Sequence, residues 1–309
     1  MLSPTPALTS SFEKALKFKT CLAQINPILG DFDRNLASHL EVIANARVHG
    51  ARLCVLPELS LTGYFLKDLV PEIAIRLEDS RLRPLLEASR EIDIVVGLVE
   101  ESTDHRFFNT AIYLHGGACI HAHRKIFLPT YGLFEEQRYF AAGDRIRAFE
   151  TSFGRAALLT CEDMWHAVPP LVAAQDGALI LIVPSAGPLR GSETQPDRDA
   201  EPESGATWEV LNRFHAKANG VYVLYANRVG FEDGINFGGG SHVVLPSGRV
   251  AAKAPILDEL LFEVEIDLGE VRRERRDSPL YRDEDLDLAL RELDWVRRRR
   301  FGRSEGERS

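Results

Sequence analysis

The chain places a thiol where an apolar segment ends abruptly. Cys161 closes the run Leu158-Leu159-Thr160 and is followed by two acids, so we predict that a strand delivers its sulfur to the start of a helix. Backbone N–H groups at a helix start favour negative charge and therefore favour a thiolate. A thiolate at the rim of a sheet could act as a nucleophile in acyl chemistry. Because most cysteines are buried and inert, this interpretation depends on the groups that accompany Cys161.

Glu58 and Lys125 also stand where strands are expected to end. Pro57, which cannot donate to a strand ladder, ends the apolar segment 51–56, and Glu58 comes next. Lys125 follows residues 120–124, in which polar and apolar side chains alternate as on a half-buried strand. Taken singly, each residue is typical of a solvated surface. With Cys161 they form a set in the order Glu, Lys, Cys, with each residue at the end of its own predicted strand.

This set resembles that of the nitrilase, or carbon–nitrogen hydrolase, superfamily. The resemblance extends over nearly all of residues 17–268, and in particular it is to the glutamine-hydrolysing domain of glutamine-dependent NAD synthetases. Several separated segments match in the family's order, which chance rarely produces. These segments are residues 23–31, 57–64, 125–140, 161–165 and 238–241.

The resemblance implies a role for each group. Glu58 would be the general base, which takes the thiol proton and passes it to the leaving nitrogen. Lys125 and the backbone N–H of Glu162 would stabilise the oxyanion. The family's second glutamate matches Glu136, in Phe134-Glu135-Glu136, and would hold Lys125 protonated and oriented.

The resemblance also implies which residues bind the substrate. In the family's glutaminase domains, the acid after the nucleophile and aromatic residues near the lysine hold the amino-acid end of glutamine. The matching residues are Glu162, Tyr131, Phe134, Tyr64 and Trp165. One departure is Gly187, where the family has a serine, and the loop 187–205 that follows is long and acidic. We expect glutamine or a similar small linear amide.

The reaction leaves alternatives open. The chain has no Ser-Gly-Gly-x-Asp-Ser pyrophosphate loop, so we expect it not to make NAD itself. We favour a hydrolase that acts on a small amide with water, with glutamine as the leading candidate. A nitrilase, a carbamoyl-amide hydrolase and a glutaminase subunit that supplies ammonia to a separate synthetase are alternatives. A scaffold subunit that retains the fold is the non-enzyme alternative.

Other polar features favour ordinary explanations. His166 lies five positions after Cys161, an offset at which helical side chains do not face each other, so a papain-like pair is not expected. His121 and His123 share one strand face, but two histidines without a third ligand are a weak metal signal. Glycines 238–240 lack the Gly-Lys-Ser/Thr ending of a phosphate loop. We expect neither a metal nor a cofactor.

Composition excludes some partners. The chain has 309 residues, 45% of them hydrophobic, and a net charge of −9, which argues against nucleic acid or an anionic membrane as partner. Neither a membrane-spanning run nor a signal peptide is evident. The four cysteines show no disulfide spacing, so we expect reduced thiols and a cytoplasmic location.

Periodicity predicts an α/β fold with mixed sheets covered by helices. The resemblance implies a four-layer α-β-β-α sandwich that forms a homodimer or higher homo-oligomer through helices next to the nucleophile. We predict a flexible tail at 1–15, the hydrolase domain at 16–268, and a charged, partly helical extension at 269–309 that packs or bridges subunits. Helices are expected at 33–49, 81–90, 169–175 and 207–219. Strands are expected at 18–25, 53–56, 94–99, 110–114, 118–123, 156–160, 179–183, 221–227, 241–245 and 260–266.

Overall fold

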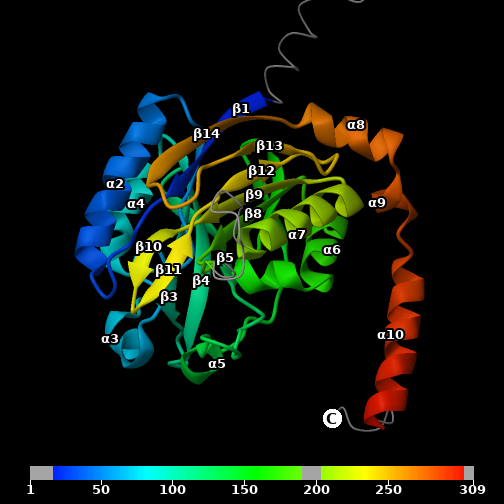
Figure 1. The fold of residues 1–309 in the computed structure, drawn as a ribbon, viewed down its shortest axis with the longest axis horizontal. Helices are drawn as coiled ribbons and strands as arrows, with labels where there is room; N and C mark the ends of the chain where they lie inside the picture. Colours follow the sequence, from blue (N-terminus) through cyan, green and yellow to red (C-terminus); the bar gives the residue numbers. More distant parts are fainter. Residues whose placement is uncertain (1–16, 190–202, 303–309) are drawn as a thin grey trace, which may run out of the picture.

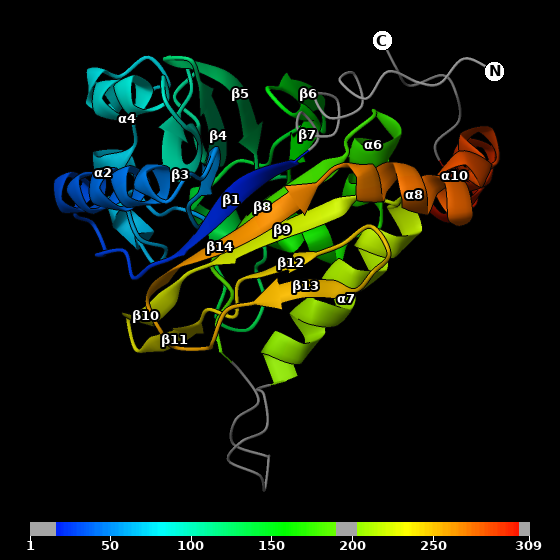
Figure 2. The same cartoon turned by 90° about the horizontal axis from the view of Figure 1, so that it is seen from above.

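The computed structural model describes residues 17–189 and 203–302. The predicted tail at 1–15, most of the loop 187–205 and the last seven residues lie outside this part. The described chain contains two six-stranded sheets and a separate two-stranded ribbon. Figures 1 and 2 show the sheets face to face, with helices on both outer sides.

Sheet A has the order β14-β1-β2-β3-β4-β5. Its central strands β1, β2 and β3 are parallel, and the other pairs are antiparallel. The strands are β1 (Lys17–Gln24), β2 (Leu53–Val55), β3 (Asp93–Glu101), β4 (Phe107–His115), β5 (Ala118–Arg124) and β14 (Leu260–Asp267).

Sheet B has the order β13-β12-β9-β8-β7-β6, with β7, β8 and β9 parallel. Its strands are β6 (Ala148–Thr151), β7 (Gly154–Leu158), β8 (Ile180–Ser185), β9 (Tyr222–Asn227), β12 (His242–Val244) and β13 (Val250–Lys253). The ribbon consists of β10 (Val229–Glu232) and β11 (Ile235–Gly238).

Helices α2 and α4 cover sheet A, and α6 and α7 cover sheet B (Figure 2). The helices are α2 (Phe32–Val48), α3 (Val70–Ile73), α4 (Arg83–Ala88), α5 (Glu136–Tyr139), α6 (Val168–Gln175), α7 (Glu203–Asn219), α8 (Gly269–Asp277), α9 (Leu280–Asp283) and α10 (Leu286–Phe301). Three short 3₁₀ helices are η1 (Lys67–Leu69), η2 (Ser80–Leu82) and η3 (Cys161–Trp165).

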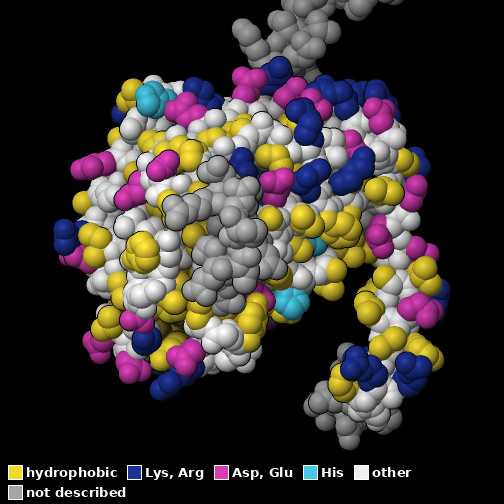
Figure 3. All heavy atoms as spheres, in the orientation of Figure 1, with side chains coloured by type: hydrophobic (Ala, Val, Ile, Leu, Met, Phe, Trp, Pro, Cys, Tyr) yellow, Lys and Arg dark blue, Asp and Glu magenta, His cyan; other side chains and the backbone are white. Residues whose placement is uncertain are grey.

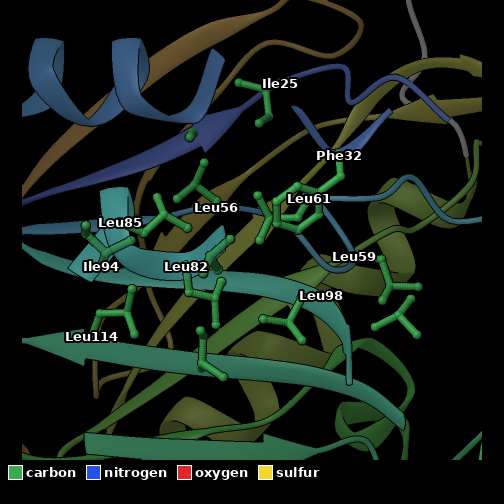
Figure 4. Close-up of a cluster of buried hydrophobic side chains, with 14 of the residues drawn as sticks. Ile25, Phe32, Leu56, Leu59, Leu61, Leu82, Leu85, Ile94, Leu98 and Leu114 are labelled. Atoms are coloured by element: carbon green, nitrogen blue, oxygen red, sulfur yellow. The ribbon is translucent and has the colours of Figure 1, made fainter. Parts of the chain in front are cut away.

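The buried apolar side chains form three clusters, one in each space between layers. Because successive strand residues face opposite sides, β1 sends Cys21 and Ala23 outward toward α2 and sends Phe18 and Leu22 inward toward sheet B. The outer cluster over sheet A is drawn in Figure 4. The third cluster joins sheet B to alanines of α6 and α7. The α-β-β-α sandwich is thereby confirmed.

Local predictions were mostly close, with two kinds of error. The helix expected at 33–49 is α2, whereas the helix expected at 81–90 is divided into η2 and α4. Pro84 stands in the first turn of α4, where its fixed φ suits a helix start. Strands β6, β10, β11 and β13 were not predicted, because in each of these four-residue strands glycine or polar residues interrupt or end the apolar run.

The C-terminal extension begins against the body and ends away from it. In α8, Arg275 donates to the carbonyls of Gly220 and Ala178 at 3.1 and 3.0 Å. In contrast, α10 has no buried residue and stands apart from the sandwich (Figures 1 and 3). Its exposed apolar residues are Leu286, Leu288, Leu290, Leu293, Trp295 and Phe301. No helix in the described ranges is long and apolar enough to cross a bilayer.

Candidate active site

Glu58 lies in a tight loop directly after β2. Strand β3 passes so close to this loop that a Cβ on Gly97 would come within 2.3 Å of the backbone nitrogen of Leu59, so only glycine fits. The Glu58 carboxylate is buried and fully bonded. Its Oε1 accepts from Asn109 Nδ2 and Lys125 Nζ, each at 2.8 Å, and its Oε2 accepts from the backbone N–H of Ala186 at 2.8 Å. These bonds fix the carboxylate in one position.

Lys125 follows β5 and is completely buried. Its Nζ donates to Glu58 Oε1 at 2.8 Å and to Glu136 Oε1 at 2.6 Å. Burial by itself would lower the pKa of Lys125, but the charges of Glu136 and Glu58 outweigh it and raise the pKa well above its ordinary value. The lysine is therefore a fixed cation between two carboxyl groups.

Glu136 opens the short helix α5 and is buried. Its Oε1 accepts from Lys125 and also from the hydroxyl of Tyr64. Burial raises the pKa of Glu136 to about 7, while Lys125 lowers it and the charge of Glu58 raises it. The hydroxyl of Tyr64, which was predicted to bind substrate, thus contacts Glu136. The two residues line a neighbouring cavity of about 320 Å³ rather than the cavity at Cys161.

Cys161 is the first residue of η3, with a positive φ of 45°. Burial and the charge of Glu58 raise the pKa of its thiol well above the ordinary value, although Lys125 and the N–H of Ala186 act in the opposite direction. The thiolate expected from a helix start is therefore wrong for the resting site, because five residues of 3₁₀ helix do not offset burial beside carboxylates. The same Ala186 N–H that lowers the pKa of the Cys161 thiol donates to Glu58 Oε2 at 2.8 Å.

Asp163 joins the turn at Cys161 to the segment that carries Lys125. Its Oδ2 accepts from the Thr160 N–H at 3.0 Å and from His123 at 2.8 Å. Its Oδ1 accepts from the N–H groups of Ile126 and Phe127 at 3.1 and 3.0 Å. Burial would raise the pKa of Asp163, but His123 and these N–H groups outweigh it and hold the pKa below its ordinary value.

Cys161 opens into a cavity of about 270 Å³. Four of the five predicted substrate-binding residues line it, namely Tyr131, Phe134, Glu162 and Trp165. The Tyr131 hydroxyl donates to Glu162 Oε1 at 2.9 Å, and burial raises the pKa of Glu162. The other lining residues are Gly187, Pro188 and Trp208. The cavity is thus walled by aromatic rings, with one carboxyl group beside the sulfur.

Gly187 is explained by its neighbours. A Cβ at this position would lie 2.9 Å from Trp208 Nε1 and 3.0 Å from the Tyr225 hydroxyl. The space of the serine that the resemblance led us to expect is therefore filled by Trp208 and Tyr225.

The sequence interpretation missed Asn109, Asp163, Trp208 and the amide of Ala186. Asn109 could have been suspected, because it is an amide within β4, a strand whose residues are mostly apolar. Asp163 carried a capping signal, since an acid three residues after Thr160 can cap a helix start. Trp208 and Ala186 gave no such signal, because neither lies near the Glu, Lys or Cys in sequence.

His121 and His166 stack on aromatic rings. His121 stacks on Phe149, with ring centroids 4.2 Å apart, and His166 stacks on Phe127 at 3.5 Å. Within residues 17–189 and 203–302, no group of three or more His, Cys, Asp or Glu side chains could hold a metal ion.

Comparison with known proteins gives a consistent picture. The family model "Carbon-nitrogen hydrolase" matches residues 19–276. The chain is 30% identical over 257 residues to the glutamine-dependent NAD(+) synthetase of Thermotoga maritima, and this match covers 82% of the chain and 43% of that protein. The chain thus spans about half the length of the curated relatives that it matches.

Two solved structures match over nearly their whole length. The carbon–nitrogen hydrolase from Helicobacter pylori G27 is 26% identical with a TM-score of 0.80, and the match covers 90% of this chain and 99% of that one. The Nesterenkonia AN1 amidase, from the nitrilase superfamily, is 25% identical with a TM-score of 0.71, covering 90% of this chain and 97% of that one.

Proposed function

The chain belongs to the carbon–nitrogen hydrolase family, and from this premise we propose that it hydrolyses a small linear amide through a thioester on Cys161, releasing ammonia. Two observations carry the proposal: Lys125 Nζ donates to Glu58 Oε1 at 2.8 Å, and the charges of both groups act on the thiol of Cys161, which lines the 270 Å³ cavity. A variant of the Nesterenkonia amidase that carries acrylamide at its active site cysteine supports the choice of nucleophile.

In the acylation half of the reaction, Glu58 is the base. The raised pKa of Cys161 keeps the thiol protonated at rest, so attack on the amide carbon requires transfer of the thiol proton to Glu58. The carbonyl oxygen becomes an oxyanion, which the Lys125 ammonium and the N–H of Glu162 would stabilise. The C–N bond then breaks, Glu58 returns the proton to the nitrogen, and ammonia leaves.

In the deacylation half, water replaces ammonia. Glu58 removes a proton from the water, whose oxygen attacks the thioester carbon. The C–S bond breaks, the sulfur regains its proton and the carboxylic acid leaves. Glu136 takes no direct part. It accepts from Lys125 and so holds the ammonium toward the reacting carbonyl.

Ammonia release tests the catalytic assignment. We expect turnover of the best amide in a panel of glutamine, asparagine, short aliphatic amides, carbamoyl amino acids and nitriles to vanish in Cys161→Ala and Glu58→Gln. Release at the wild-type rate from Cys161→Ala would overturn the proposal. No turnover of any compound by the wild type would favour a scaffold role.

Glutamine is our leading substrate. The Glu162 carboxyl group and the Tyr131 hydroxyl offer acceptors for the substrate ammonium, and the aromatic walls suit an aliphatic stem. Glu162→Gln should weaken glutamine turnover more than turnover of butanamide. Equal effects on the two compounds would indicate a different substrate.

A second candidate is a glutaminase that supplies ammonia to a separate synthetase. It is favoured by the 30% identity to a glutamine-dependent NAD(+) synthetase over 82% of this chain. The test mixes the protein with an ammonia-dependent NAD synthetase. The absence of both a complex and glutamine-supported synthesis would count against it.

We also propose a cytoplasmic homo-oligomer. All four cysteines are free, which suits a reducing compartment. Exposed apolar side chains gather on η3, α6 and α7, where Trp165, Val168, Val210 and Phe214 are exposed. Light scattering that gave the monomer mass at micromolar concentration would contradict the oligomer.

A further inference from the structure

A buried ion pair lies outside the proposed catalytic groups. Arg228 precedes β10 and Glu232 ends it, and both side chains are almost fully buried. Nη1 of Arg228 donates to Oε2 of Glu232, and its guanidinium stacks on Phe237 at 4.2 Å from the ring centroid. A buried ion pair contributes little net stability. We therefore ask which segments of the chain this pair connects.

Glu232 reaches from the ribbon to the loop that follows Glu58. Its Oε1 accepts from the backbone N–H groups of Tyr64 and Phe65 at 2.8 and 2.6 Å. Gly63 allows this approach, since a Cβ there would lie 2.9 Å from Glu232 Oε2. Glu232 therefore fixes the backbone of Tyr64, and Arg228 keeps Glu232 in place.

Tyr64 connects Glu232 to Lys125 through Glu136. Its hydroxyl donates to Glu136 Oε1, the oxygen that also accepts from Lys125 Nζ at 2.6 Å. Burial raises the pKa of Glu136, and the Tyr64 hydrogen bond is one of the contacts that lower it. The ionisable groups near Glu136 are Lys125, Glu58, Tyr64 and Cys161. Lys67, Glu135, Tyr139 and Asp233 also line the neighbouring cavity.

We propose that Glu232, held by Arg228, is a positioning residue for the amide hydrolysis proposed above. It sets the backbone of Tyr64 so that the tyrosine hydroxyl keeps the Glu136 carboxylate on Lys125. Glu232 does not line the cavity at Cys161. Its hydrogen bonds go to Tyr64, Phe65 and Arg228 and not to the proposed reacting groups. The inference depends on the proposed function, because its effect is read through catalysis.

The test compares pH profiles of kcat/KM for Glu232→Gln, Tyr64→Phe and the double variant. An amide at 232 cannot accept from Tyr64 and Phe65 with one atom and from Arg228 with the other. We expect Glu232→Gln to move the acid limb up by about one pH unit. We expect kcat to fall about tenfold with little change in KM. Tyr64→Phe should act alike, and the double variant should add little to either.

The matched control is Asp93→Asn. Asp93 is also a buried, fully bonded carboxylate, but it bonds Tyr113 and His115 rather than any proposed catalytic group. We expect this variant to lower stability and leave the acid limb in place. If Glu232→Gln does not fold, Glu232→Asp replaces it. The shorter side chain keeps a negative charge near Arg228 but no longer reaches the backbone N–H of Tyr64, so its pH profile should show the same shift.

An acid limb in the Glu232 variants that coincides with the wild-type limb would overturn the positioning role. So would effects of Glu232→Gln and Tyr64→Phe that add fully in the double variant. Failure of the wild type to hydrolyse any amide is a different result, because it would overturn the proposed function first.

Discussion

Replacing Asp163 by asparagine should destabilise the folded protein, because this carboxylate joins the turn at Cys161 to the segment that carries Lys125. Its four acceptor contacts are to Thr160, His123, Ile126 and Phe127. Asparagine keeps one acceptor oxygen and turns its NH₂ toward two donors. His123 can change tautomer and accept, but the buried Thr160 N–H cannot.

The expected cost follows from these contacts. One buried N–H left without an acceptor costs about 1–3 kcal/mol, and the remaining bonds lose their charge assistance. We therefore expect Asp163→Asn to lower the free energy of unfolding by about 2–4 kcal/mol. The measure is the urea midpoint at an unchanged m-value. Asp104→Asn, which alters an exposed carboxylate, should leave the midpoint nearly unchanged.

The pH dependence gives a second check. The pKa of Asp163 is lower in the folded protein than in the unfolded chain, so its contribution is complete above about pH 4. That contribution is lost as the pH falls further, through the folded pKa. The wild type and Asp163→Asn should therefore converge in stability below about pH 4. A midpoint for Asp163→Asn equal to that of the wild type at pH 7 would refute this reasoning.

Three further predictions concern catalysis. Lys125→Met, which leaves Glu58 and Glu136 without their cation, should lower kcat by about 10²–10³-fold, and steady-state turnover within threefold of wild type would contradict this. Because burial raises the pKa of Glu136 to about 7, kcat/KM should fall as the pH drops below about 7. Glu136→Gln should abolish that limb, and a limb that persists in the variant belongs to another group. Gly187→Ser should force Trp208 or Tyr225 to move and reduce turnover of glutamine more than turnover of acetamide, and equal losses would argue against a steric effect in the cavity.

The sequence predicted individual helices and strands better than it predicted how the strands pair into sheets. Long or strongly patterned elements such as α2 and β1 were visible in the sequence, because their apolar residues recur with a clear period. The pairing of two sheets was available only from the resemblance, since period alone does not say which strands share a sheet. Short strands such as β10 and β11 show neither a period nor a continuous apolar run, because glycine and polar residues interrupt them.

In the candidate site too, some features could be predicted from the sequence and others could not. Glu58, Lys125 and Cys161 could be singled out because each follows a strand, where a side chain at the sheet's edge can face a cavity. Tyr64 was assigned to substrate, yet its hydroxyl meets Glu136. The thiol was expected to ionise, yet its carboxylate neighbours and burial oppose this. Neither contact could be read from the sequence, because the residues involved are distant in the chain.

The central claim is that Cys161 becomes acylated, and mass spectrometry tests it most directly. The protein is mixed with its best amide, quenched in acid during turnover and digested. We predict that the peptide containing Cys161 gains the mass of the acyl group, and that Cys161→Ala shows neither this adduct nor ammonia release. Steady ammonia release without an adduct in the wild type, and unchanged release from Cys161→Ala, would contradict the account.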